Sequence, residues 1–152
     1  MNAGHATTHA DWLTAVRRYL LASAAGHLAW EAAQLPFYTL WNTASAGQIA
    51  WAMLHCTVGD LAIASVTLML ALAAGGRAAW PVKGVSTIAG IVIVGSVGYT
   101  AYSEYLNTVT RQSWAYTAMM PTLLGIGLLP LAQWVVVPGL SLAWACRRAT
   151  IA

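Results

Sequence analysis

The chain alternates between four long apolar segments and short polar stretches. The apolar segments run over residues 19–41, 48–74, 84–106 and 115–145. Each is long enough to cross a bilayer, for which a helix needs about 20 apolar residues. Their Ala, Leu, Val and Gly residues follow no strict alternation, which favours helices over the strands of a membrane barrel. We therefore predict an all-α integral membrane four-helix bundle that forms a single domain over residues 1–152.

The basic residues orient these predicted helices. If four helices alternate across the membrane, both chain termini lie on one side. That side carries six basic residues, Arg17, Arg18, Arg77, Lys83, Arg147 and Arg148, and the opposite side carries only Arg111. Short loops rich in Lys and Arg stay in the cytoplasm. We therefore expect both termini to be cytoplasmic and the protein to lie in a bacterial inner membrane.

The start of the first apolar segment imitates a secretory signal. Arg17 and Arg18 precede a short apolar stretch that ends in small residues at 22–24. The apolar run continues well past that point, through Glu31, whereas a signal peptide ends at its cleavage site. We expect this segment to be retained as the first helix.

Composition removes several classes of function. Hydrophobic residues make up 59% of the chain and charged residues 7%, whereas soluble domains average about 25% charged residues. This excludes a soluble globular domain and a disordered chain. The formal charge of +3 comes without any Lys/Arg run, so no nucleic-acid partner is expected. Cys56 and Cys146 fall at different depths, which argues against a disulfide, and no Cys/His cluster indicates a metal or another cofactor.

Three of the four acidic residues lie inside apolar segments. Glu31 and Asp60 fall near the middle of the first and second segments, and Glu104 falls near the outer end of the third. A charged side chain at the bilayer centre costs about 2.5–3.5 kcal/mol, so such residues usually mark a functional site. The alternative is a hydrogen-bonded tie that only fixes helix packing.

The first segment carries a polar stripe. The spacing of His27, Glu31, Gln34 and Tyr38 places them on one helical face, which we expect to point into the bundle. Counting from the hairpin centre near residue 44 puts His27 at the depth of Asp60.

The same count puts Gln34 at the depth of His55. We therefore predict one cavity with His27, Glu31 and Asp60, and a layer nearer the outer face with Gln34, His55, Tyr38 and Glu104. The two histidines differ by about 9 Å of helix rise, which disfavours a shared haem. We expect Gln133 to serve packing.

Short motifs in a shared order resemble the EXPERA family of sterol isomerases and sigma-2-like receptors. The matching pieces are His27-Leu-Ala-Trp-Glu31, Glu31-Ala-Ala-Gln34-Leu-Pro36-Phe37, His55-Cys-Thr-Val-Gly-Asp60, Tyr102-Ser103-Glu104 and Trp134…Pro138-Gly139. The resemblance implies a helical bundle around a lipophilic cavity, in which acidic and His residues move a proton to and from a double bond. It implies that His27 and Glu31 handle protons, that Asp60 stabilises positive charge and that Trp134 offers a π face to a cation.

Pattern and resemblance together give two sets of candidate residues. The catalytic candidates are His27, Glu31, Asp60 and Glu104, and the ligand-binding candidates are Gln34, Tyr38, His55, Tyr102 and Trp134. The first hypothesis is a protein that binds a lipophilic, sterol- or lipid-like molecule, as a binder or as a double-bond isomerase.

Two other classes of function stay open. The histidines and carboxyls at several depths are also compatible with a proton-coupled transporter or proton-relay subunit. The small size allows an accessory subunit of a membrane redox complex. Membrane lipid is an expected partner in each case. The small residues Ser86, Gly90 and Gly98 favour close helix packing, within the chain or in a homo-oligomer.

Overall fold

Four long helices make up most of the computed structural model, which describes residues 9–75 and 80–147. They are α1 (His9–Gln34), α3 (Ala46–Gly75), α4 (Val85–Tyr105) and α5 (Leu128–Cys146). The connecting elements are a 3-10 turn η1 (Leu35–Phe37), the single turn α2 (Leu40–Thr43), a π-helical turn η2 (Leu106–Thr110) and the strands β1 (Thr122–Leu123) and β2 (Ile126–Gly127).

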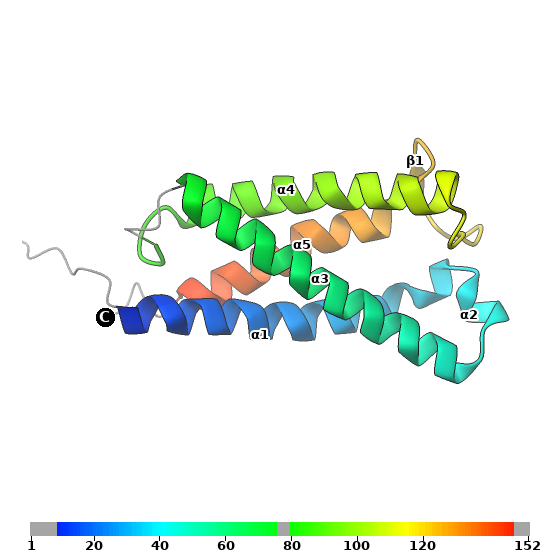
Figure 1. The fold of residues 1–152 in the computed structure, drawn as a ribbon, viewed down its shortest axis with the longest axis horizontal. Coiled ribbons are helices and arrows are strands. Elements are labelled where there is room, and N and C mark those ends of the chain that lie inside the picture. Colours follow the sequence, from blue (N-terminus) through cyan, green and yellow to red (C-terminus); the bar gives the residue numbers. More distant parts are fainter. Residues whose placement is uncertain (1–8, 76–79, 148–152) are drawn as a thin grey trace, which may run out of the picture.

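Each long helix packs against two others. Both α1 and α4 contact α3 and α5, so the four helices close into a ring around a shared interior (Figure 1). The start of α1 and the end of α5 lie at one end of this ring, and α2 and β1 lie at the other end (Figure 1). The interior of the ring is where the polar residues of the first helix meet those of its neighbours.

The first helix ends earlier than the sequence predicted. It stops at Gln34 rather than continuing to residue 41. Pro36 lacks an N–H group and its ring clashes with the carbonyl four residues earlier, so a helix does not continue through it. Tyr38 follows in an extended conformation, with φ −108° and ψ 144°. Tyr38 therefore leaves the helical face on which its spacing had placed it.

The last helix begins later than the sequence predicted. It starts at Leu128, not at residue 115, and the preceding residues form a loop that contains the β1–β2 hairpin. Leu124 and Gly125 both have positive φ, 53° and 80°, as a tight two-residue hairpin turn requires. Pro121 therefore shapes this loop instead of the helix in which we had placed it.

The distribution of side chains is inverted relative to a soluble protein. Charged and amide side chains such as His27, Glu31 and Gln133 are buried, whereas Met69 and Val94 are more than two-thirds exposed. Within the described residues, α3, the segment 85–110 and α5 are long and apolar enough to cross a membrane. The chain is thus a helical protein with three candidate membrane-spanning helices, which suggests a membrane protein.

The small residues Gly90 and Gly98 of α4 make no close helix contact within the chain. A Cβ on Gly90 or Gly98 would meet nothing within 4 Å, so these glycines do not bring helices together inside the chain. A Cβ on Gly26 would lie 2.8 Å from Cγ1 of Val137. Gly26 therefore allows α1 and α5 to come close, directly before His27 at the centre of α1.

Candidate functional site

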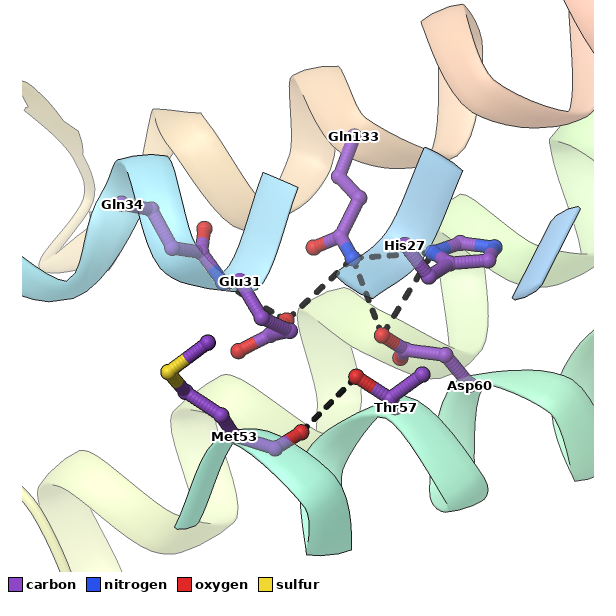
Figure 2. Close-up of polar contacts among 7 residues, drawn as sticks. All are labelled: His27, Glu31, Gln34, Met53, Thr57, Asp60 and Gln133. Carbon is purple, nitrogen blue, oxygen red and sulfur yellow. Dashed lines mark hydrogen bonds and ion pairs between the residues drawn. The ribbon is translucent and has the colours of Figure 1, made fainter. Parts of the chain in front are cut away.

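Side chains from three helices meet at the middle of the ring. His27 and Glu31 come from α1, Asp60 from α3 and Gln133 from α5 (Figure 2). Nδ1 of His27 lies 3.4 Å from Oδ2 of Asp60, which agrees with the equal depth that the hairpin count predicted. Among the described residues this is the one ion-pair contact of the structure, and it is charged only when the imidazole is protonated.

The amide of Gln133 links the other three side chains. Its Nε2 donates to Oδ2 of Asp60 at 2.9 Å and to Oε1 of Glu31 at 3.2 Å, and it lies 2.8 Å from Nδ1 of His27 (Figure 2). An amide NH2 group has two hydrogens, and here it faces three acceptors. At any moment one of the three acceptors receives no hydrogen from Gln133. That acceptor is satisfied only if another group supplies a proton.

The same amide bridges the two carboxyl groups, because Nε2 of Gln133 donates to both of them. Two carboxylates held at one site repel each other, and a proton on one of them removes that repulsion. The arrangement therefore favours a Glu31–Asp60 pair that shares one proton, with Gln133 donating to the oxygens that remain as acceptors. The described Lys and Arg side chains make no ion pair with either carboxyl group.

Two further residues complete this cluster. Nε2 of Gln34, one turn along α1, donates to Oε1 of Glu31 at 2.8 Å. The indole ring of Trp134 lies against the His27 imidazole, with ring centroids 4.6 Å apart and planes inclined by 48°. Trp134 and His27 are both fully buried. We call His27, Glu31, Gln34, Asp60, Gln133 and Trp134 the central cluster.

Glu104 lies in a second polar site nearer the outer end of α4. It accepts hydrogen bonds from the Tyr116 hydroxyl and from Nε1 of Trp114, the latter at 3.5 Å, and both donors come from the loop before α5. The Tyr116 hydroxyl in turn accepts from the Gly127 amide at 3.0 Å. Burial raises the pKa of Tyr116, so its phenol keeps the proton that it donates. The structure thus separates Glu104 from the central cluster.

Three predicted ligand-binding residues also lie outside the central cluster. His55 is exposed on α3 and stacks on Trp51, with ring centroids 5.9 Å apart, so it does not meet Gln34. Tyr102 is 63% exposed on α4. Tyr38 packs against Tyr116 at 5.4 Å between centroids and belongs with the Glu104 site. Helical counting misplaced Tyr38 because α1 stops before Pro36.

Gln133 is the central residue that sequence reasoning missed. It was assigned to packing because a single amide in an apolar segment does not indicate which way it faces. One signal was available: Gln133 directly precedes Trp134, which had been singled out for its place near the end of the chain. The described residues contain no group of three His, Cys, Asp or Glu side chains arranged to hold a metal ion.

Comparisons with protein-family models, with curated proteins and with solved structures find no match to this chain. The chemistry of the site therefore has to be argued from its own geometry.

Proposed function

We propose that this protein binds a lipophilic, sterol- or lipid-like molecule that carries or develops positive charge next to the Glu31–Asp60 pair. The observation that carries the proposal is the buried pair itself, held by Gln133 and without a described Lys or Arg partner. Buried carboxylates need a compensating charge or a proton. A ligand cation that enters from the bilayer would supply that charge and release the proton.

Trp134 supports the same reading. Its ring packs on His27 at the edge of the central cluster, and an indole face attracts a cation within about 6 Å of its centroid. A ligand with a cationic centre and an apolar body would therefore find both a carboxylate and an aromatic face. This agrees with the EXPERA resemblance, in which His27, Glu31, Asp60 and Trp134 are the matching residues.

The same groups could act as a double-bond isomerase. The protonated carboxyl of the pair would donate its proton to one carbon of a ligand double bond, which creates a carbocation. The deprotonated carboxyl, or Nδ1 of His27, would then remove a proton from a neighbouring carbon, and the double bond re-forms one position away. Atoms and electrons balance, because one proton enters and one leaves. This scheme needs two acid–base groups in contact, and the central cluster contains them.

The proposed setting is a bundle of four membrane-spanning helices, with α1 as the fourth span. Arg17 and Arg18 lie in the first half of α1, Lys83 lies between α3 and α4, and Arg147 directly follows α5. α1 begins and α5 ends at the same end of the ring (Figure 1). The positive-inside rule then places that end in the cytoplasm, in a bacterial inner membrane. Lipid is the immediate partner of the apolar exterior, and a second copy of the chain remains a candidate partner.

Binding of a sterol-like tertiary amine tests the proposal. The protein is reconstituted in lipid nanodiscs, and binding of the tritiated amine is compared with binding of the matching neutral sterol. Glu31→Gln and Asp60→Asn should each weaken amine binding about ten- to a hundredfold, the range for losing a hydrogen bond to a charged group. Glu104→Gln is the matched control and should keep near-wild-type binding. Equal affinity in all four proteins would contradict the proposal.

A proton relay is the second candidate, and the geometry of Gln133 favours it. Two amide hydrogens shared among three acceptors allow the hydrogen bonds to rearrange when a proton moves between His27, Glu31 and Asp60. In this case the amine would bind weakly or not at all. Proteoliposomes with an imposed pH gradient would then show proton flux that Asp60→Asn abolishes.

A further inference from the structure

A line of buried polar groups runs along α1 from the central cluster toward the end of the ring where α1 begins. Tyr19, Ser23 and His27 are spaced four residues apart, and each is fully buried. Spacing of this kind puts them on one face of the helix, over about 12 Å of its length. That face is the one that packs against α3 and α5.

Each of these three residues has a polar atom without a hydrogen-bond partner in the described protein. The atoms are the Tyr19 hydroxyl oxygen, Oγ of Ser23 and Nε2 of His27. The Tyr19 and Ser23 side chains lie one helical turn apart on the buried face of α1. Buried polar groups are almost always hydrogen-bonded, and those that lack a protein partner are typically bonded to internal water.

His27 connects this line to the central cluster. Its Nδ1 faces Gln133 and Asp60, so a neutral ring that accepts from Gln133 carries its hydrogen on Nε2. That Nε2–H has no acceptor in the described protein. One ring nitrogen is thus part of the cluster, and the other is buried without a partner in the described protein.

We propose that Tyr19, Ser23 and His27 hold a file of ordered water molecules, and that protons pass along it between the Glu31–Asp60 pair and the Tyr19 hydroxyl, toward the end of the ring where α1 begins. Each water would bridge two of the unpartnered atoms, as internal waters with two to four polar contacts do. A proton that enters the file at one end displaces another into the carboxyl pair, so no other reactant is needed.

The neighbouring residues set the limits of this path. Tyr19 belongs to a buried cluster that contains the apolar side chains of Leu68 on α3 and Leu142 on α5, and the Cys146 thiol at the end of α5. The titratable groups near the line are therefore Tyr19 and Cys146 at one end, and His27, Glu31 and Asp60 at the central cluster. Glu104 lies in the outer site, so the path extends from the central cluster toward the end of the ring where α1 begins. The inference rests on one part of the proposed function, namely that the Glu31–Asp60 pair holds an exchangeable proton.

Infrared spectroscopy of the full chain in nanodiscs tests this inference. The carbonyl stretch of the protonated carboxyl group is identified by its loss in Asp60→Asn, and its shift is followed after rapid transfer into D2O. Ser23→Val fills the path with methyl groups and should slow the exchange about tenfold, as expected when a transfer step loses one hydrogen-bonded partner. Tyr19→Phe removes only a hydroxyl group and should slow it in the same direction.

Ser96 provides the matched control. It is as completely buried as Ser23, but it lies on α4 and its hydroxyl donates to Oγ1 of Thr67 at 3.2 Å. Ser96→Val should leave the exchange rate unchanged. If Ser23→Val does not fold, Tyr19→Phe alone decides the result.

Wild-type exchange in the folded Ser23 and Tyr19 variants would overturn the water file and leave the proposed function standing. A wild-type protein without any protonated-carboxyl band would contradict both.

Discussion

The Gln133 side chain should stabilise the whole protein, and the substitution Gln133→Leu measures by how much. Leu has nearly the same volume but donates no hydrogen bond, and Gln133 is 2% exposed, so water cannot replace the lost donor. The amide has two hydrogens, and therefore two hydrogen bonds are lost. Hydrogen bonds between membrane helices contribute on average about 0.6 kcal/mol and at most about 1.7 kcal/mol. The free energy of unfolding should fall by about 1–3.5 kcal/mol.

Reversible unfolding in mixed micelles, followed by circular dichroism as the share of denaturing detergent rises, gives this free energy. Gln34→Leu is the control on the same cluster. Gln34 donates one hydrogen bond to Glu31, and its own Oε1 is buried without a described partner. Removing an unsatisfied buried oxygen offsets the lost bond, because such a group costs about 1–3 kcal/mol. Gln34→Leu should therefore be neutral or stabilising.

A combined replacement gives the refuting result. If Gln133 acts through Glu31 and Asp60, then changing Glu31, Asp60 and Gln133 all to Leu should restore part of the stability, because the two carboxyl groups that need its hydrogens are removed and only Nδ1 of His27 is left without a donor. Equal losses in the single and triple variants would mean that Gln133 stabilises by packing alone. A change of less than about 0.5 kcal/mol in Gln133→Leu, the ordinary range for surface substitutions, would refute the reasoning outright.

Two further predictions concern the outer site and the α1–α5 contact. Because burial raises the pKa of Tyr116, its protonated phenol stabilises the folded state at neutral pH, and stability should fall as pH rises above the ordinary tyrosine value of about 10. In a pH series, the melting temperature of Tyr116→Phe should fall less at high pH than that of the wild type. Equal falls would show that the Tyr116–Glu104 hydrogen bond does not stabilise the fold. Gly26→Ala places a Cβ 2.8 Å from Val137 and should cost about 1–3 kcal/mol of unfolding free energy by overpacking. The double variant with Val137→Ala should recover part of the lost unfolding free energy. If it recovers none, the Gly26–Val137 contact is not the cause of the loss.

The local sequence pattern predicted the features that depend on hydropathy and on helical geometry. The helical segments follow from hydropathy. The shared depth of His27 and Asp60 follows from a fixed rise per residue in α1 and α3, which a short connection joins. The count failed at Tyr38, because Pro36 ends the helix before it. It failed again at residues 115–127, whose apolar composition is compatible with a helix although Pro121 and Gly125 prevent one.

The part of the site that could not be predicted comes from α5. Gln133 is far from His27 along the chain, and its direction depends on how α5 rotates against α1, which hydropathy does not fix. The contact between Gly26 and Val137 is likewise set by the fold and not by hydropathy. The outer position of Glu104 was expected from its place near the end of the third apolar segment, but its hydrogen-bond partners were not. Its partners Tyr116 and Trp114 come from a loop whose path only the fold determines.

The polarity of α1 makes the site and the membrane fold depend on each other. Within the described residues, α3, α4 and α5 are apolar enough to cross a bilayer, and α1 is not among them. Its buried face carries Ser23, His27, Glu31 and Gln34, and a lipid-exposed charge such as that of Glu31 would cost about 2.5–3.5 kcal/mol. α1 can therefore remain among the other helices only while α3 and α5 pack against this face. At the middle of the face, the contacts are made by Asp60 of α3 and Gln133 of α5. A variant that breaks the central cluster should accordingly loosen α1 as a whole. Hydrogen exchange along α1 should rise in Gln133→Leu before it rises in α4, and equal protection of the two helices would show that α1 is held by its apolar contacts instead.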